Sequence, residues 1–187
     1  MYSYEQPRPS VTVDIALFGV LQGPQGYNVR LLLIQRSLGS QAFPGAYALP
    51  GGFLNVGAGI EQGEDLEDAA KRELEEETGI KVDHLNQFRT YGKPNRDPRG
   101  RVISIGHMGI VRLAQDDLNV IASDDAADAS WVVLDKAKRM QLAFDHSVIV
   151  QDATICMKQF LWNSQHYASI NHKDFTTQEL EILTHLL

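Results

Sequence analysis

The sequence is short of cysteine and of long apolar runs. Cys156 is the only cysteine, so no disulfide bond can form within the chain. Such sparing use of cysteine is typical of a reducing compartment, and we expect a cytoplasmic protein. No apolar run approaches the roughly 20 residues of a membrane-spanning helix, and the first ten residues, MYSYEQPRPS, lack the apolar core of a signal peptide. These absences exclude a disulfide-stabilised scaffold and predict no membrane partner.

Positive charge is also scarce. Lys and Arg number 17 against 24 Asp and Glu, which gives a formal net charge of −7. An acidic surface has no general attraction for nucleic acid, so we expect no nucleic-acid partner. Phosphate groups would have to be bound by local Arg or Lys side chains or by a metal ion. A chain of 187 residues suits a single domain, which we expect to span residues 1–187.

One stretch, Leu49–Ile80, stands out for its glycine-rich start and its glutamate-rich end. Asp65 is a suitable helix N-cap, and Gly79 suits the left-handed position that closes a helix. The spacing between them predicts a helix with one buried face. That face would carry Leu66, Ala69, Ala70 and Leu74.

Another face of this helix gathers carboxylates. Glu73, Glu76 and Glu77 stand at i, i+3 and i+4, so their side chains project together. Hard divalent cations prefer such oxygen ligands, and Mg²⁺ leaves room for substrate phosphates in its coordination sphere. The alternative is an ordinary solvated face, in which Arg72 simply pairs with Glu76 one turn away.

The complete pattern resembles the box of the Nudix hydrolase family. The run from Arg72 to Ile80 reads R-E-L-E-E-E-T-G-I and fits R-E-U-x-E-E-x-G-U, where U is a bulky apolar residue. Glu64 also stands where the family pattern has its first glutamate. The loop between Gly52 and Glu64 is six residues longer than in the family, with the extra residues drawn from 55–62.

The resemblance implies an α/β protein, a Nudix-type α/β/α sandwich with a mixed central sheet and a core over about residues 10–165. It implies Mg²⁺, or Mn²⁺, held by Glu73, Glu76, Glu77 and the backbone carbonyl of Gly52. It assigns catalytic roles to Glu76, Glu77 and Arg72. In relatives the general base is a box glutamate or an acid before the last strand; here that loop offers Asp124, Asp125 and Asp128, of which we choose Asp125. Relatives are commonly homodimers, and we expect one here.

The rest of the chain alternates strands and helices. Apolar patterning predicts strands at 11–18, 29–34, 82–91, 103–113 and 131–134, with a turn at 23–26 and an acidic loop at 116–128. Asp145 is the expected N-cap of a later helix. A polar connector over 163–175 leads to a last helix, opened by a capping box of Thr176 and Glu179.

Residues 91–104, YGKPNRDPRGRVIS, resemble a signature of ADP-ribose pyrophosphatase-like Nudix domains, including those of bifunctional NAD-metabolism enzymes and of transcriptional regulators. Arg36, Arg99 and Arg101 could hold a pyrophosphate or ribose, although Arg99 could instead pair locally with Asp97. Phe53 could stack on adenine, as could Phe18 or Tyr47, although such aromatics also serve as core residues.

The resemblance therefore implies a small-molecule nucleotide substrate. The expected reaction is Mg²⁺-dependent hydrolysis of ADP-ribose, or a related nucleoside diphosphate derivative, to AMP and a sugar phosphate. Two alternatives stay open. One is a regulator domain that senses ADP-ribose without turnover. The other is a hydrolase of nucleoside triphosphates or dinucleoside polyphosphates.

Overall fold

The computed structural model describes residues 6–57, 63–118, 126–166 and 175–187. Its centre is a mixed sheet of seven strands. The strands are β1 (Ser10–Gly23), β2 (Gly26–Arg36), β3 (Tyr47–Ala48), β4 (Gly51–Phe53), β5 (Asn86–Tyr91), β6 (Val102–Leu113) and β7 (Ala126–Val133). The helices are α1 (Leu66–Thr78), α2 (Leu134–Ala137), α3 (His146–His166) and α4 (Thr177–Leu186), with a 3-10 turn at Asp116–Leu118.

Strand β1 is the middle of the sheet. It runs parallel to β6 from Ser10 to Leu21 and antiparallel to β2 and β4 on its other edge. The predicted turn is confirmed, because β1 and β2 form a hairpin that closes with Gly23 opposite Gly26. On that second edge, β4 pairs with Thr12–Asp14, and β2 pairs with β1 from Phe18 onward. The two neighbours of β1 therefore divide one edge between them.

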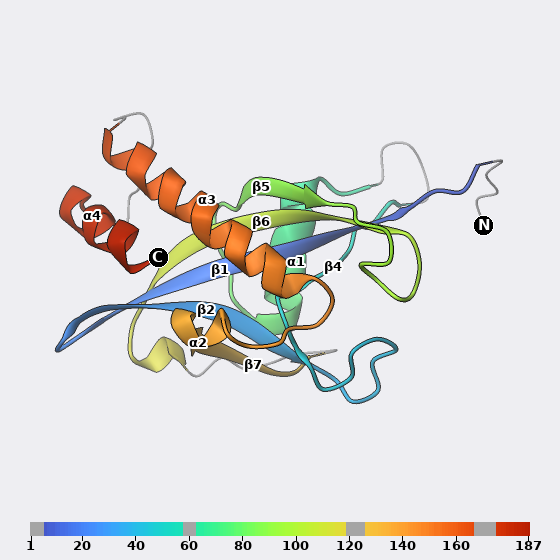
Figure 1. Ribbon diagram of the computed structural model, residues 1–187, viewed down its shortest axis with the longest axis horizontal. Helices are drawn as coiled ribbons and strands as arrows, with labels where there is room; N and C mark the ends of the chain where they lie inside the picture. Colours follow the sequence, from blue (N-terminus) through green and yellow to red (C-terminus); the bar gives the residue numbers. More distant parts are fainter. Residues whose placement is uncertain (1–5, 58–62, 119–125, 167–174) are drawn as a thin grey trace.

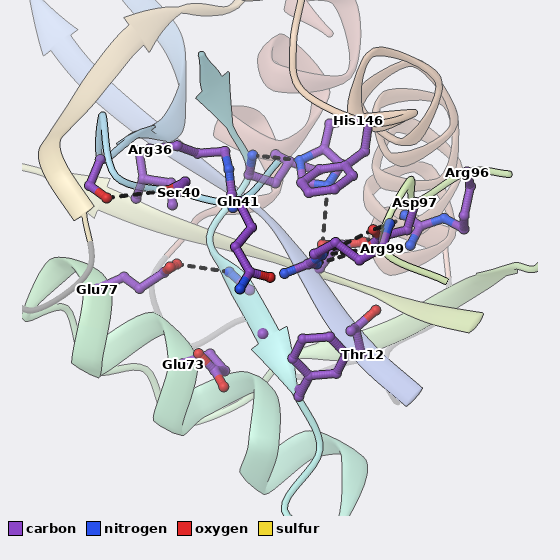
Figure 2. A pocket seen from close by; sticks show the side chains of 18 of the residues that line it. Thr12, Arg36, Ser40, Gln41, Glu73, Glu77, Arg96, Asp97, Arg99 and His146 are labelled. Carbon is purple, nitrogen blue, oxygen red and sulfur yellow. Dashed lines mark hydrogen bonds and ion pairs between the residues drawn. The ribbon is translucent and has the colours of Figure 1, made fainter. Parts of the chain in front are cut away.

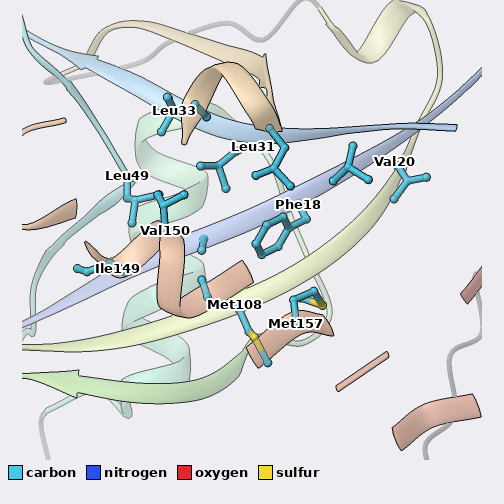
Figure 3. Close-up of a cluster of buried hydrophobic side chains, with 14 of the residues drawn as sticks. Phe18, Val20, Leu31, Leu33, Leu49, Met108, Ile149, Val150 and Met157 are labelled. Carbon is cyan, nitrogen blue, oxygen red and sulfur yellow. The ribbon is translucent and has the colours of Figure 1, made fainter. Parts of the chain in front are cut away.

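Helices cover both faces of the sheet, which confirms the predicted α/β/α sandwich (Figure 1). Helix α1 lies on one face, and helices α2, α3 and α4 lie on the other. Side chains of β1 alternate between the two layers. Val13, Ile15 and Leu17 pack toward α1, whereas Ala16, Phe18 and Val20 belong to the α3 layer, part of which Figure 3 shows. Phe18 is thus a core residue with no exposed surface.

Helix α1 begins and ends where the sequence predicts. The Asp65 side chain accepts a hydrogen bond from the Glu67 N–H, and Gly79 adopts φ 70° in the left-handed region. Ala69, Ala70 and Leu74 are fully buried, while Leu66 is only partly buried at the edge of the same cluster.

Two predicted strands have different limits in the structure. The strand predicted at 82–91 begins only at Asn86, and the strand predicted at 131–134 is the longer β7. β7 pairs with β2 from Val133 opposite Arg30 to Asp128 opposite Gln35, so Asp128 lies in a strand and not in the acidic loop. Hydrogen bonding to β2 overrides the polar composition of this segment.

Helix α3 follows Asp145 as predicted, but the carboxylate of Asp145 binds Arg96 through both oxygens. Its backbone carbonyl, and not its side chain, caps the helix by accepting hydrogen bonds from the N–H groups of Val148 and Ile149. Residues 163–166 of the predicted connector are helical, and 167–174 lie outside the described residues. The capping box that opens α4 is confirmed. Among the described segments, no helix has the length and apolarity needed to cross a membrane.

Candidate active site

A cavity of about 560 Å³ opens where β4 and β2 share the edge of β1 (Figure 2). This volume suits a small-molecule ligand. Its wall comes from seven parts of the chain: β1, the end of β2, the 37–41 loop, the segment 49–55 with β4, helix α1, the 96–99 loop and the start of α3. Loops and strand ends converge here from across the sequence, which makes this cavity the candidate active site.

Helix α1 gives the cavity an acidic wall. Glu73 and Glu77 both line it, and Figure 2 shows the two side chains reaching from α1 on the same side. The Gly51 N–H donates to the Glu77 carboxylate at 2.9 Å. Burial, helped by the nearby charge of Glu73, raises the pKa of Glu77 to about 8. Two acidic groups held this close are a natural position for a cation.

Arg72 organises the other glutamates. Its guanidinium donates to Glu64 at 2.6 and 2.8 Å, to Glu73 at 2.7 Å and to Glu76 at 2.9 Å. It also reaches the Phe53 carbonyl at 3.2 Å. The helix-surface pair with Glu76 is therefore present together with an orienting contact to Glu73.

The lengthened box loop is closed at its base. The Asn55 N–H donates to the Glu64 carboxylate at 2.7 Å, and the Glu64 N–H donates to the Asn55 carbonyl at 3.1 Å. Hydrogen bonds from Arg72 lower the pKa of Glu64, which keeps it charged. The extra residues therefore leave Glu64 and Arg72 in contact, although 58–62 themselves lie outside the described residues.

The donor set fits a hard divalent cation in its chemistry. Carboxylates of Glu73 and Glu77 face one cavity, and a Cβ at Gly52 would lie 2.4 Å from the Glu73 carboxylate, so only glycine leaves that space open. Glu76 is turned away: its side chain is 49% exposed, bonded to Arg72 and absent from the cavity wall. Within the described residues, no three Asp, Glu, His or Cys side chains are gathered as a ready metal site.

The facing wall is basic and aromatic. Arg36 and Arg99 line it, each over the Phe144 ring, at 5.1 and 5.5 Å from guanidinium carbon to centroid. Arg99 also lies 5.1 Å from the ring centre of Phe53. Asp97 accepts from Arg99 at 2.7 and 3.0 Å, so the local pair expected as an alternative is present and holds Arg99 at the cavity. Such a fixed guanidinium suits phosphate oxygens.

A buried ion network that also lines the cavity was not predicted. Arg96, whose side chain is 3% exposed, donates to Asp14 at 3.1 Å and to Asp145 at 2.6 and 3.0 Å. His146 accepts from the Leu49 N–H through Nδ1, which leaves its Nε2 3.3 Å from Asp14. Burial raises the pKa of Asp14, but His146, Arg96 and a hydrogen bond from Ser104 outweigh it and hold the pKa at about 2.

The remaining predicted residues are not in the cavity wall that the described residues form. Arg101 is exposed and donates to the Gly92 carbonyl, and it does not appear in the cavity wall that the described residues form. Asp125, chosen as the general base, and Asp124 lie outside the described residues. Tyr47 is partly buried against the α3 layer. A signal for the missed network did exist, since Asp14 is a charged residue inside an otherwise apolar strand.

Known proteins share this architecture. A family model described as NUDIX domain matches residues 12–153. An ADP-ribose pyrophosphatase of Methanocaldococcus jannaschii is 38% identical over 144 residues, covering 77% of this chain and 72% of that protein. The ADPR responsive transcriptional repressor NtrR of Acinetobacter baylyi is 36% identical over 153 residues, covering 80% of this chain. The chain spans about half of the repressor's length, 54%.

Solved structures agree. The NUDIX domain of Shewanella oneidensis NrtR in complex with ADP ribose has a TM-score of 0.67 and 28% identity, covering 81% of this chain and 90% of that one. A bifunctional NMN adenylyltransferase/ADP ribose pyrophosphatase of Francisella tularensis has a TM-score of 0.61 and 26% identity, covering 79% and 42%. Two kinds of protein, pyrophosphatases and regulators, thus share this fold.

Proposed function

The chain belongs to the NUDIX family, and from that premise we propose that it hydrolyses the pyrophosphate bond of ADP-ribose or a related nucleoside diphosphate derivative. The products would be AMP and a sugar phosphate. The observation that carries the proposal is the pairing of walls in one cavity, with Glu73 and Glu77 on one side and Arg36 and Arg99 on the other. A diphosphate needs both a cation site and fixed guanidinium groups.

Glu73, Glu77 and the Gly52 carbonyl are the groups that would hold Mg²⁺ or Mn²⁺. The chemistry that such a bound cation supplies is neutralisation of phosphate charge and activation of a water molecule. Arg72 orients Glu73 and Glu76 through its hydrogen bonds. Glu76 joins the site in our proposal by exchanging its contact with Arg72.

The basic wall would bind the rest of the substrate. Asp97 holds the Arg99 guanidinium in place, which reduces the entropy lost when it binds a phosphate oxygen. Phe53 and Phe144 present rings at the cavity, and Phe53 is 43% exposed, so an adenine could stack there. Asp125 stays our candidate for the general base.

A second candidate function is ADP-ribose sensing without turnover. The likeness to NtrR and to the ADP-ribose complex of NrtR favours it, and another NrtR structure contains a 27mer DNA. The acidic balance of this chain and its retained box glutamates favour hydrolysis instead. Cytoplasmic location and a homodimeric state remain part of our proposal for the enzyme.

The experiment is an assay of the purified protein with Mg²⁺ and a panel of ADP-ribose, nucleotide sugars, dinucleoside polyphosphates and nucleoside triphosphates, with released monophosphate measured. We expect AMP release from ADP-ribose, and a loss of it with EDTA. Release of monophosphate from nucleoside triphosphates alone would show that these compounds, and not ADP-ribose, are the substrate. Binding of ADP-ribose without release from any compound would favour sensing.

A further inference from the structure

His146, the first residue of α3, has a buried imidazole ring that uses both of its nitrogens (Figure 2). Its Nδ1 lies 2.9 Å from the backbone nitrogen of Leu49, and its Nε2 lies 3.3 Å from the Asp14 carboxylate. A backbone N–H can donate only to an unprotonated nitrogen, so the ring is neutral and carries its proton on Nε2. With both nitrogens bound inside the protein, His146 can act on a ligand only through its partners.

The segment that follows Leu49 carries parts of the acidic wall. The Gly51 N–H donates to the Glu77 carboxylate at 2.9 Å. At the next residue, the absence of a side chain at Gly52 leaves the space that the Glu73 carboxylate occupies. The backbone that meets both carboxylates therefore begins two residues after the hydrogen bond to His146.

The place of this segment is set by contacts from two sides. The Ala143 N–H donates to the Tyr47 carbonyl at 2.8 Å, and the Ile15 N–H donates to the Pro50 carbonyl at 2.9 Å. The hydrogen bond that His146 accepts lies between these two along the chain. It is the one of the three that a side chain makes. Because β4 has only three residues, the segment leading into it helps to decide where it lies.

We propose that His146 is a positioning residue for the cation site. By accepting the Leu49 N–H, its neutral ring holds β4 at the place where it meets Glu73 and Glu77. This inference rests on the proposed function, because it takes these two carboxylates to be cation ligands. The basic wall of the cavity does not depend on this hydrogen bond.

Two substitutions separate the contacts of the ring. His146→Asn puts an amide oxygen at the place of Nδ1 and keeps an acceptor for Leu49, whereas His146→Gln puts an amide N–H near the place of Nε2 and keeps a donor for Asp14. Without the acceptor, the buried Leu49 N–H is unpaired, which is unfavourable, and the segment should move toward another partner.

The main readout is Mn²⁺ affinity, measured by electron paramagnetic resonance without substrate. We expect His146→Gln to bind Mn²⁺ about tenfold more weakly and His146→Asn to stay within about twofold of the wild type. The kcat for ADP-ribose should follow the same order. The KM for ADP-ribose should stay within about twofold in both variants, because the basic wall is unchanged.

Thermal unfolding separates positioning from general stability. Both variants should unfold at a lower temperature than the wild type, because each leaves one buried partner of His146 unpaired. Equal Mn²⁺ affinity in the two variants, or a loss in His146→Asn alone, would overturn the inference. If His146→Gln does not fold, His146→Asn decides alone: retained Mn²⁺ affinity supports the inference and a tenfold loss overturns it.

Nitrogen NMR of the labelled wild type gives a test that needs no variant. At neutral pH we expect the His146 ring to be neutral with its proton on Nε2, and a proton on Nδ1 would overturn the inference. A wild type that binds Mn²⁺ but hydrolyses no compound would overturn the proposed function alone. A wild type that binds no Mn²⁺ would overturn both.

Discussion

Replacing Arg96 with Met tests the buried ion network in the cavity wall. The substitution keeps an apolar stem but removes a guanidinium that is 3% exposed and donates to Asp14 and Asp145. Removing one partner of a buried ion pair costs about 3–5 kcal/mol. We expect a loss near the lower limit, about 3 kcal/mol, because His146 and Ser104 still serve Asp14 and because Asp145 is 20% exposed. For a domain of this size that lowers Tm by roughly 6–12 °C.

The measurement is urea unfolding followed by far-UV circular dichroism at pH 7. Arg89→Met is the matched control, because it makes the same change in a pair with Asp152 where the Arg89 side chain is 58% exposed. Exposed pairs contribute at most about 1 kcal/mol. A loss in Arg96→Met no larger than in Arg89→Met would refute the reasoning.

The pH dependence adds a second check on the same variant. In the wild type the pKa of Asp14, about 2, lies below its unfolded value of 3.8, so its stabilisation is complete at neutral pH and is lost as the pH falls toward 2. Without Arg96, one of the charges that lower the pKa of Asp14 is gone, so this pKa rises toward its unfolded value. The stability difference between Arg96→Met and wild type should therefore shrink as the pH falls toward 2, and a difference that stays constant from pH 5 to pH 2 would contradict this.

Three further predictions concern Gly52 and the glutamates of α1. Gly52→Ala should displace the Glu73 carboxylate, because the new Cβ would lie 2.4 Å from it. We expect lower Mg²⁺-dependent turnover with little change in Tm. The control is Gly23→Ala, whose new Cβ has its nearest contact at 3.7 Å and should leave turnover unchanged. Glu76→Gln should lower kcat at least about a hundredfold with an unchanged circular dichroism spectrum, and wild-type turnover would remove Glu76 from the site. Because the pKa of Glu77 is about 8, Mg²⁺ binding should release protons and tighten as the pH rises from 6 to 8, which calorimetry in two buffers of different ionisation enthalpy would detect.

The sequence predicted α1 well because its signals are local. Asp65, Gly79 and the spacing of the buried alanines all act within one helix, and local hydrogen bonds decide where it begins and ends. The limits of β7 could not be predicted in the same way. They depend on β2, a strand about a hundred residues earlier, as the hydrogen bond from Arg30 to the Trp131 carbonyl across 101 positions illustrates.

The candidate site likewise has features that one sequence motif predicts and features that depend on distant residues. The carboxylates of α1 could be named from one motif, but their orientations could not, since Glu76 follows Arg72 outward while Glu77 meets the Gly51 N–H. The sequence shows Arg96 only as one residue of the 91–104 run. Its partner Asp14 is 82 positions away, and only the folded sheet brings them together.

This network also bears on the choice between hydrolysis and sensing. Arg96 connects the 96–99 loop to the start of α3 through its hydrogen bonds to Asp145. A ligand bound by Arg99 would therefore contact a loop that is hydrogen-bonded to the start of that helix. In our proposal, turnover requires the glutamates of α1, whereas ligand binding by this wall does not. A regulator could therefore use the same cavity without those carboxylates. The presence of Glu73 and Glu77 at the cavity is our reason to propose hydrolysis for this chain.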